Sequence, residues 1–360
     1  MKRGRLLLLV FPLIAGAFYL RSLASWRPRK VFTGQGQVSI LSFSGDGGKV
    51  LVGHSPSNGF IGSYRPTGIK LLDVNNDFTL LWQSRDKFVT MGRSQFIAQN
   101  SQISLGTRRV DARTGSFLKK YIEGGVRSFS PDGQWLADSW FAGNAMQVYI
   151  YTSDKTPNYE RALDAAKILG SRNQLVQDVA FSPNGKQLVV CVGQRKGTRL
   201  DFYDVNSWRL MKSVSTPTVI RPLIQNRSGG LFRYVQWSRN GRFMLSWGWL
   251  PYYPPTGGEA FDLTLWRVSD TKKLASTQVQ DVSGRPQVGP LRFEVQNDGS
   301  VLSVIDDKNA YLSSPANLNL KSRRLLLLPH ETITVATMSP DGSYLLAGTQ
   351  SGRIYWQRVK

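Results

Sequence analysis

The sequence is poor in the residues that build metal and redox sites. Its 360 residues contain one cysteine, Cys191, and two histidines, His54 and His330. A single cysteine excludes a disulfide within the chain and any cysteine cluster around a metal, and two histidines are too few for a histidine-rich metal site. Cys191 lies in the apolar run 188–192, which is typical of a small buried side chain. We therefore expect neither a metal nor a cofactor.

The sequence also lacks the short motifs of common enzyme classes. It has no Gly-x-Ser-x-Gly and no phosphate-binding P-loop, and His330-Glu331 is not followed by a second histidine. For the remaining titratable candidates we predict structural roles: an exposed loop position for His54, a solvated turn for Asp306 and Asp307, and turn capping for Asp201 and Asp204. No catalytic residue is predicted, which favours a non-enzymatic protein.

Acidic residues are scarce relative to basic ones. There are 24 Asp and Glu against 46 Lys and Arg, a net charge of +22, and residues 1–30 hold seven basic residues and no acidic one. This excess favours anionic partners such as lipid headgroups, an acidic polymer or a glycan. Because the basic residues are scattered along the chain, two interpretations stay open: a generally basic solvated surface and a dedicated anion-binding face.

The only long apolar run is near the N-terminus. Residues 6–20 are uncharged and follow Lys2, Arg3 and Arg5. A 15-residue helix spans roughly 22 Å, short of the roughly 30 Å hydrocarbon core, but extension to Trp26 lengthens it. The alternative is a secretory signal peptide with a cleavage site at 22–24. We predict a hydrophobic helix within residues 1–28, acting as a signal peptide or as a membrane anchor through residues 6–26. The protein is expected to be membrane-anchored or exported, on the extracytoplasmic face rather than in the cytoplasm.

From residue 29 onward, short β-forming runs alternate with a recurring turn. Its best copy is Phe129-Ser130-Pro131-Asp132-Gly133, and Asp-Gly or Asn-Gly turns of this kind favour hairpins because glycine adopts positive φ. Near copies end at Gly47, Gly185, Gly241, Gly299 and Gly342, and a frame without the aspartate ends at Gly92. The seven glycines are 41 to 58 residues apart, and repeats near 40–45 residues with four strands each indicate propeller blades.

A second marker supports this count. The distance from turn glycine to the end of a later strand is 19 residues in three successive repeats, from 92 to 111, 133 to 152 and 185 to 204. We predict an all-β fold, a seven-bladed β-propeller of four-stranded antiparallel blades over residues 29–360. A short surface helix is expected at 158–167.

These residues resemble the WD-repeat β-propellers, in a degenerate form of bacterial type. The resemblance rests on the Ser-Pro-Asp-Gly turns, on Leu200–Val205 and Val110–Gly115, and on Pro329-His330, which is similar to the family's Gly-His element. It implies that residues 29–33 supply the missing outer strand of the last blade and close the ring. The Tol-associated periplasmic propellers share the turn but have six blades, so the blade count separates the two.

The resemblance also implies that loops between second and third strands open on one face. The segments expected there are rich in aromatic and basic residues, a composition favoured at binding hot spots. The predicted interaction face comprises Tyr64, Arg65, Trp140, Phe141, Arg195, Lys196, Trp247, Trp249, Tyr252 and Tyr253.

Two functions remain open at this stage. The first is a membrane-directed or exported scaffold that binds a protein partner, with an acidic polymer or glycan as a further partner class; export disfavours a nucleic acid strand. The second is a propeller enzyme or small-ligand binder of the hydrolase or lactonase type that uses the central channel.

Overall fold

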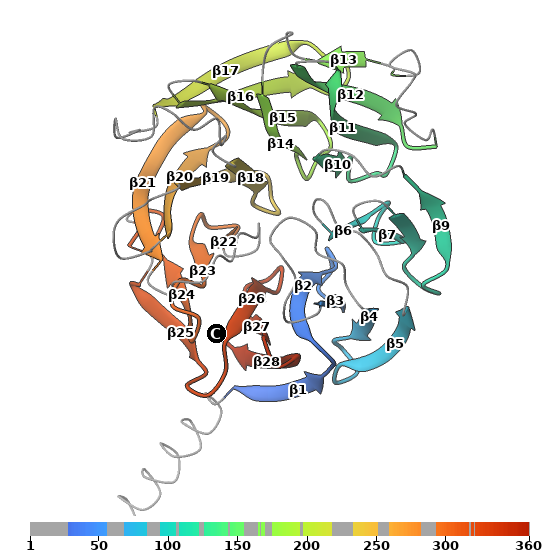
Figure 1. The fold of residues 1–360 in the computed structure, drawn as a ribbon, viewed down its shortest axis with the longest axis vertical. Coiled ribbons are helices and arrows are strands. Elements are labelled where there is room, and N and C mark those ends of the chain that lie inside the picture. The colour runs from blue at the N-terminus through green and yellow to red at the C-terminus, as the bar shows by residue number, and fades with distance from the viewer. Residues whose placement is uncertain are drawn as a thin grey trace, which may run out of the picture.

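The computed structural model describes residues 28–55, 68–84, 94–105, 108–121, 126–142, 145–154, 165, 167–169, 175–194, 197–217, 233–250, 259–281, 293–316, 318–319 and 321–359. Within these ranges the chain forms 28 strands in seven four-stranded antiparallel sheets, and no helix. The sheets are arranged as blades around a ring (Figure 1). The seven-bladed propeller predicted from the turns is therefore confirmed. The predicted N-terminal helix lies outside the described residues.

Each blade runs from an inner to an outer strand. Blades 1 and 2 consist of β2 (Gln37–Phe43), β3 (Lys49–Ser55), β4 (Gly68–Asp73) and β5 (Thr79–Ser84), and of β6 (Ser94–Ile97), β7 (Gln102–Leu105), β8 (Arg108–Asp111) and β9 (Phe117–Lys120). Blades 3 and 4 consist of β10 (Arg127–Phe129), β11 (Trp135–Ala142), β12 (Ala145–Thr152) and β13 (Lys167–Leu169), and of β14 (Leu175–Phe181), β15 (Gln187–Gln194), β16 (Gly197–Asp204) and β17 (Leu210–Pro217).

The last three blades follow the same order. Blades 5 and 6 consist of β18 (Arg233–Trp237), β19 (Phe243–Leu250), β20 (Glu259–Arg267) and β21 (Lys272–Asp281), and of β22 (Phe293–Val295), β23 (Val301–Ser303), β24 (Asn309–Ser313) and β25 (Arg323–Leu327). Blade 7 consists of β26 (Ile333–Met338), β27 (Tyr344–Thr349), β28 (Arg353–Arg358) and, as its outer strand, β1 (Arg29–Thr33).

The outer strand of blade 7 comes from the other end of the described chain. β1 pairs antiparallel with β28, with Arg29 opposite Trp356 and Thr33 opposite Arg353. This is the ring closure that the sequence predicted for residues 29–33. Closure pairs the edge of β28, which would otherwise be open to pairing with another chain.

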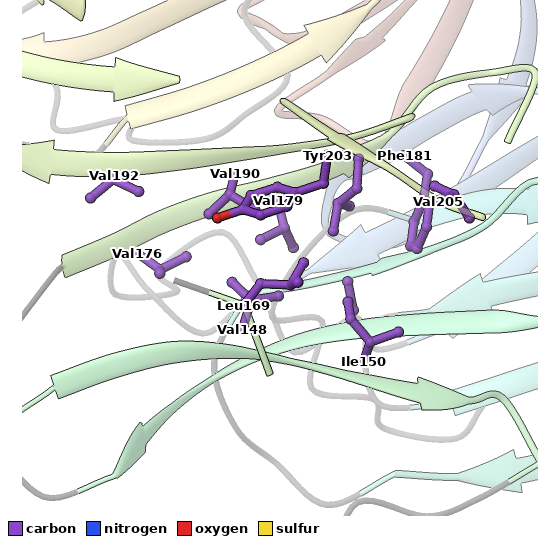
Figure 2. Packing of buried hydrophobic residues seen from close by; sticks show 12 residues of the cluster. Val148, Ile150, Leu169, Val176, Val179, Phe181, Val190, Val192, Tyr203 and Val205 are labelled. Carbon is purple, nitrogen blue, oxygen red and sulfur yellow. The ribbon is translucent and has the colours of Figure 1, made fainter. Parts of the chain in front are cut away.

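The hydrophobic core is divided among the seven contacts between neighbouring blades. In the described residues each interface holds one cluster of buried apolar side chains drawn from both blades. Figure 2 shows the cluster between blades 3 and 4, where Val148 and Ile150 of β12 pack toward Val179 and Val190 of the next blade. Buried Cys191 belongs to the next interface, as predicted. Each blade is thus stabilised mainly by its neighbours.

The recurring turns join the first and second strands of their blades. In the last copy, Ser339 Oγ donates to Asp341 Oδ1 at 2.5 Å, and this carboxylate accepts the backbone N–H of Ser343 at 3.0 Å. Gly342 closes the turn with φ 71°. The glycines of the other five Asx-Gly copies also have φ between 70° and 85°. Left-handed φ costs glycine nothing, which explains why this residue marks the turns.

Blade 2 differs from the prediction. Its first strand is β6, so the turn lies after residue 97 and not at Gly92, which is outside the described residues. The turn uses Ala98, Gln99 and Asn100, all with φ between 50° and 66°. The marker at Gly92 was therefore wrong, and the 19-residue spacing from 92 to 111 was coincidental. The number of blades is unaffected.

Candidate interaction faces

Antiparallel pairing sorts the connections of the propeller onto two faces. Connections from first to second strand and from third to fourth strand start and end on one face, which we call the turn face. Connections from second to third strand and from one blade to the next start and end on the other, which we call the loop face. Figure 1 is viewed down the ring, so that the outer strands mark its circumference.

Most of the predicted interaction residues belong to loop-face connections. Six of the ten lie outside the described residues, in the segments 56–67, 195–196 and 251–258: Tyr64, Arg65, Arg195, Lys196, Tyr252 and Tyr253. Three others are strand residues rather than loop residues, since Trp140 and Phe141 lie in β11 and Trp249 lies in β19. A shared interaction face for these nine residues remains a prediction.

Trp247 has a structural role instead. It lies inside β19, is 2% exposed, and belongs to the core between blades 5 and 6. Its ring packs edge-on against Phe293 with the ring centroids 6.0 Å apart, and at a tilt of 31° against Tyr234 with the centroids 5.6 Å apart. Buried aromatic pairs of this kind add to the energy of packing. Trp247 is thus a core residue and not part of an exposed face, because β19 extends three residues beyond it.

His54 was predicted to be an exposed loop residue, and this was wrong. It lies in β3, is 3% exposed, and shares a 3.3 Å hydrogen bond between Nε2 and the carbonyl oxygen of Gly352. The same carbonyl accepts the N–H of Gly34 at 2.8 Å. His54 therefore joins blade 1 to the segment after β1 and to the β27–β28 connection, which is where the ring closes.

The surroundings of His54 keep it neutral. Burial, together with charge repulsion from Lys70, lowers its pKa to about 4, and the hydrogen bond to the Gly352 carbonyl opposes this shift. The Lys70 ammonium lies 4.4 Å above the ring centroid of Phe32 in β1, and burial lowers the pKa of Lys70 as well. A neutral imidazole at neutral pH is a donor through Nε2–H to Gly352, which fixes its tautomer.

The buried carboxylates of blades 3 and 4 have partners in their own or the next blade. Asp138 forms a buried pair with Arg127, with Nε and Oδ1 3.0 Å apart, although burial raises the pKa of Asp138 overall. Asp178 accepts the N–H of Val235 in blade 5 at 2.8 Å. Asp201 was predicted to cap a turn, but it is buried in the middle of β16 and binds Arg199 through both oxygens, at 2.8 and 2.7 Å.

Two turn predictions concern Asp204 and Asp306. Asp204 caps its turn as predicted, accepting the N–H and the hydroxyl of Ser207 at 2.7 and 2.8 Å. Asp306 was predicted in a solvated turn but is partly buried, and it accepts the hydroxyl of Tyr311 at 2.6 Å. Burial and this hydrogen bond raise the pKa of Tyr311 to about 12. In the part of the chain that the structure describes, no three His, Cys, Asp or Glu side chains are grouped as metal ligands would be.

The turn face carries a contact that crosses the ring. Arg239, in the first turn of blade 5, donates to the carbonyl oxygen of Met338 in blade 7 at 3.0 Å and to that of Ser44 in blade 1 at 3.5 Å. Its guanidinium also lies 3.8 Å from Glu294 in blade 6. Burial lowers the pKa of Arg239, and Glu294 opposes this shift. Blades 5 and 1 are not neighbours, so the side chain reaches over the centre of the turn face.

The turns around Arg239 also bond to one another. The N–H of Asn240 donates to Asn297 at 2.9 Å, Asn297 donates to the carbonyl oxygen of Pro340 at 3.3 Å, and Gly45 donates to Asn100 at 3.0 Å. These bonds link blades 5 to 6, 6 to 7 and 1 to 2. These bonds and those of Arg239 therefore connect the turns of blades 5, 6, 7, 1 and 2, as expected for scaffold.

The two sets of connections differ in their content of charged residues. Taking the residues between consecutive strands, the loop-face connections contain twelve Lys and Arg against five Asp and Glu, whereas the turn-face connections contain eight against nine. The strand order assigns most of these basic residues in the sequence to connections that join strand ends on the loop face. Eleven of the twelve lie outside the described residues, so a positively charged loop face remains a prediction.

Comparisons with known proteins support the fold. No family model and no curated protein sequence matches the chain. Among solved structures, it is similar to hydrazine synthase of Kuenenia stuttgartiensis (TM-score 0.61, 14% identity, 92% of this chain and 98% of that chain). It is also similar to the β-propeller domain of Cps50 (Swd1) of Myceliophteria thermophila (0.57, 14%, 92% and 99%) and to the Dos1 propeller (0.56, 10%, 92% and 95%).

At 10–14% identity these likenesses concern the fold alone. Among the described residues, no helix is long and apolar enough to cross a membrane. By blade number, strand order and likeness to WD40-type structures, the chain is a seven-bladed β-propeller.

Proposed function

We propose that this protein is a non-enzymatic scaffold that is directed to a membrane by residues 6–26 and binds an acidic protein partner on its loop face. The proposal is supported by the sequence of the connections: those that join strands on the loop face contain twelve basic and five acidic residues, eleven of the basic ones outside the described residues, and those on the turn face contain eight and nine. A positive face attracts an acidic partner and raises its rate of association.

The location of sequence variation among the repeats agrees with this proposal. The turn-face connections between first and second strands keep one length and one turn chemistry in six blades, whereas the loop-face connections vary from two residues at 195–196 to fifteen at 218–232. Binding residues are commonly carried by variable loops on a rigid scaffold. The aromatic residues Trp249, Tyr252 and Tyr253 supply the kind of side chains that dominate protein interfaces.

The test is affinity capture of the full chain extracted from membranes. Partners captured by the wild type are compared with those captured by a triple variant with Trp249, Tyr252 and Tyr253 replaced by alanine. The proposal predicts that an acidic protein is lost from the triple variant and is recovered less as salt is raised, because surface charges are screened. Identical captured partners would contradict the blade 5 interface.

A further inference from the structure

The outer strands form a basic band around the propeller. The seven outer strands together contain ten Lys and Arg but only one acidic residue, Asp281. Seven of the nine exposed large hydrophobic side chains in the described residues also lie on outer strands of blades 1 to 4: Leu80, Leu81, Phe117, Leu118, Ile168, Leu210 and Met211. Basic residues interleaved with exposed apolar ones are the composition of surfaces that adsorb to anionic membranes.

The chain enters the propeller on this band. Arg29 is the first residue of β1, and only two residues separate it from Trp26, the end of the apolar N-terminal stretch. Three residue steps of extended chain cover roughly 10 Å. A stretch inserted in a bilayer would therefore hold the outer edge of blade 7 close to the lipid headgroups. The turn face and the loop face would then be perpendicular to the membrane plane, and neither face would lie against the bilayer.

A surface ion pair connects the entry point to the apolar residues of blade 1. β1 runs from the turn face to the loop face, since Arg29 pairs with Trp356 near the end of β28. The Arg29 guanidinium forms a 2.9 Å ion pair with Asp77, in the turn just before β5. Leu80 and Leu81 follow three and four residues later and are 50% and 44% exposed. They therefore lie beside the entry point.

The same edge continues into blade 2. Trp82 of β5 donates through Nε1 to the carbonyl oxygen of Ala112 at 2.9 Å, in the turn before β9. β9 begins with Phe117 and Leu118, which are 54% and 47% exposed, and ends with Lys119 and Lys120. Figure 1 shows β1, β5 and β9 as consecutive outer strands of the ring.

We propose that the outer edge of blades 7, 1 and 2 rests on an anionic lipid bilayer, with Leu80, Leu81, Phe117 and Leu118 at the headgroup boundary and the exposed Lys30 and Lys120 facing the phosphates. This contact rests on the proposed membrane direction, because residues 6–26 set which part of the band meets the bilayer. It leaves both faces accessible, so a partner on the loop face and the membrane do not compete.

The test uses the full chain reconstituted into phosphatidylcholine vesicles with or without phosphatidylglycerol. Cys191 is replaced by serine, and single fluorophores are attached at Leu81→Cys, at Leu118→Cys, or at Leu210→Cys as the matched control. Leu210 is 53% exposed, at least as much as Leu81 and Leu118, and begins the outer strand of blade 4, on the far side of the ring. In anionic vesicles we expect a spin-labelled lipid to quench the fluorophores at positions 81 and 118 but not the one at 210. In neutral vesicles we expect no quenching at any of the three positions.

Charge reversal provides the second arm. The pair Lys30→Glu and Lys120→Glu is expected to abolish quenching at position 81, whereas Lys272→Glu and Lys273→Glu on blade 5 leave it unchanged. Two results would overturn the edge contact: equal quenching at all three labels, or no quenching at 81 and 118 in chains that float with the vesicles. Either result would still agree with direction to the membrane by residues 6–26. Chains that do not float with either vesicle overturn both.

Discussion

Because His54 is buried and neutral, we expect the ring closure to weaken in mild acid. The perturbation is a fall in pH from 7 to 4. Folding lowers the His54 pKa from 6.5 to about 4 because the ring is buried next to Lys70. Between these pH values the unfolded chain binds a proton that the folded protein does not bind, so the stabilisation is complete above pH 6.5 and is lost as the pH falls toward 4.

The size of this loss follows from the shift. A shift of one pKa unit corresponds to about 1.4 kcal/mol, so His54 accounts for about 3 kcal/mol of stability between pH 6.5 and 4. This is a large share of the 5–15 kcal/mol that is typical of a folded domain. The assay is chemical denaturation followed by tryptophan fluorescence at several pH values in this window.

The matched variants are His54→Gln and His330→Gln. Glutamine at position 54 retains an N–H donor for the Gly352 carbonyl but cannot bind a proton, so the pH dependence between 6.5 and 4 should flatten by about 3 kcal/mol. His330→Gln, at an exposed position, controls for the removal of a histidine. Equal pH dependence in the wild type and His54→Gln would refute the reasoning, whatever the absolute stability of the variant.

Three further predictions concern stability. Gly34→Ala should lower the free energy of unfolding by about 1–3 kcal/mol, measured in urea, because the added methyl group would overlap the His54 ring; unchanged stability would show that the closure is loosely packed. Arg239→Leu should cost about 2–3 kcal/mol by leaving the Met338 carbonyl and Glu294 without their cation, and an unaltered melting temperature would contradict the contact across the turn face. Asp341 has its pKa lowered to about 2, chiefly by hydrogen bonds from Ser339 and Ser343, so its stabilisation is present above pH 4 and is lost as pH falls through 2. Because this carboxylate is exposed, Asp341→Ala should lower the free energy of unfolding by only about 1 kcal/mol at pH 7. An equal loss at pH 7 and pH 2 would contradict stabilisation by the ionised carboxylate.

The blade number was predictable because turn chemistry is local. A Ser-x-Asx-Gly segment specifies its own hydrogen bonds and needs glycine for positive φ, as at Gly342. The same logic failed in blade 2, where Ala98, Gln99 and Asn100 adopt positive φ without glycine. Ring closure by residues 29–33 was predictable from the resemblance to WD-repeat propellers, because the strand order it implies left the last blade without a fourth strand.

The burial of His54 and Trp247 was not predictable, because both depend on distant parts of the chain. His54 is covered by Gly352, 298 residues away, and by Phe32 of β1. Trp247 is covered by Phe293 of the following blade. In β3 both sides of the strand are buried, so no alternation of apolar and polar residues marks which residues face inward. The difference in charged-residue content between the two sets of connections likewise appears only when each connection is assigned to a face by the strand order.

The claim that the loop face binds the partner is tested most directly by matched charge reversals. Arg195→Glu with Lys196→Glu changes a loop-face connection of blade 4, and Lys186→Glu with Arg242→Glu changes turn-face connections of blades 4 and 5 by the same amount. The measurement is the dissociation constant for the captured acidic partner. Binding weakened only by the loop-face pair is the predicted result, and equal weakening by the two pairs would contradict the account.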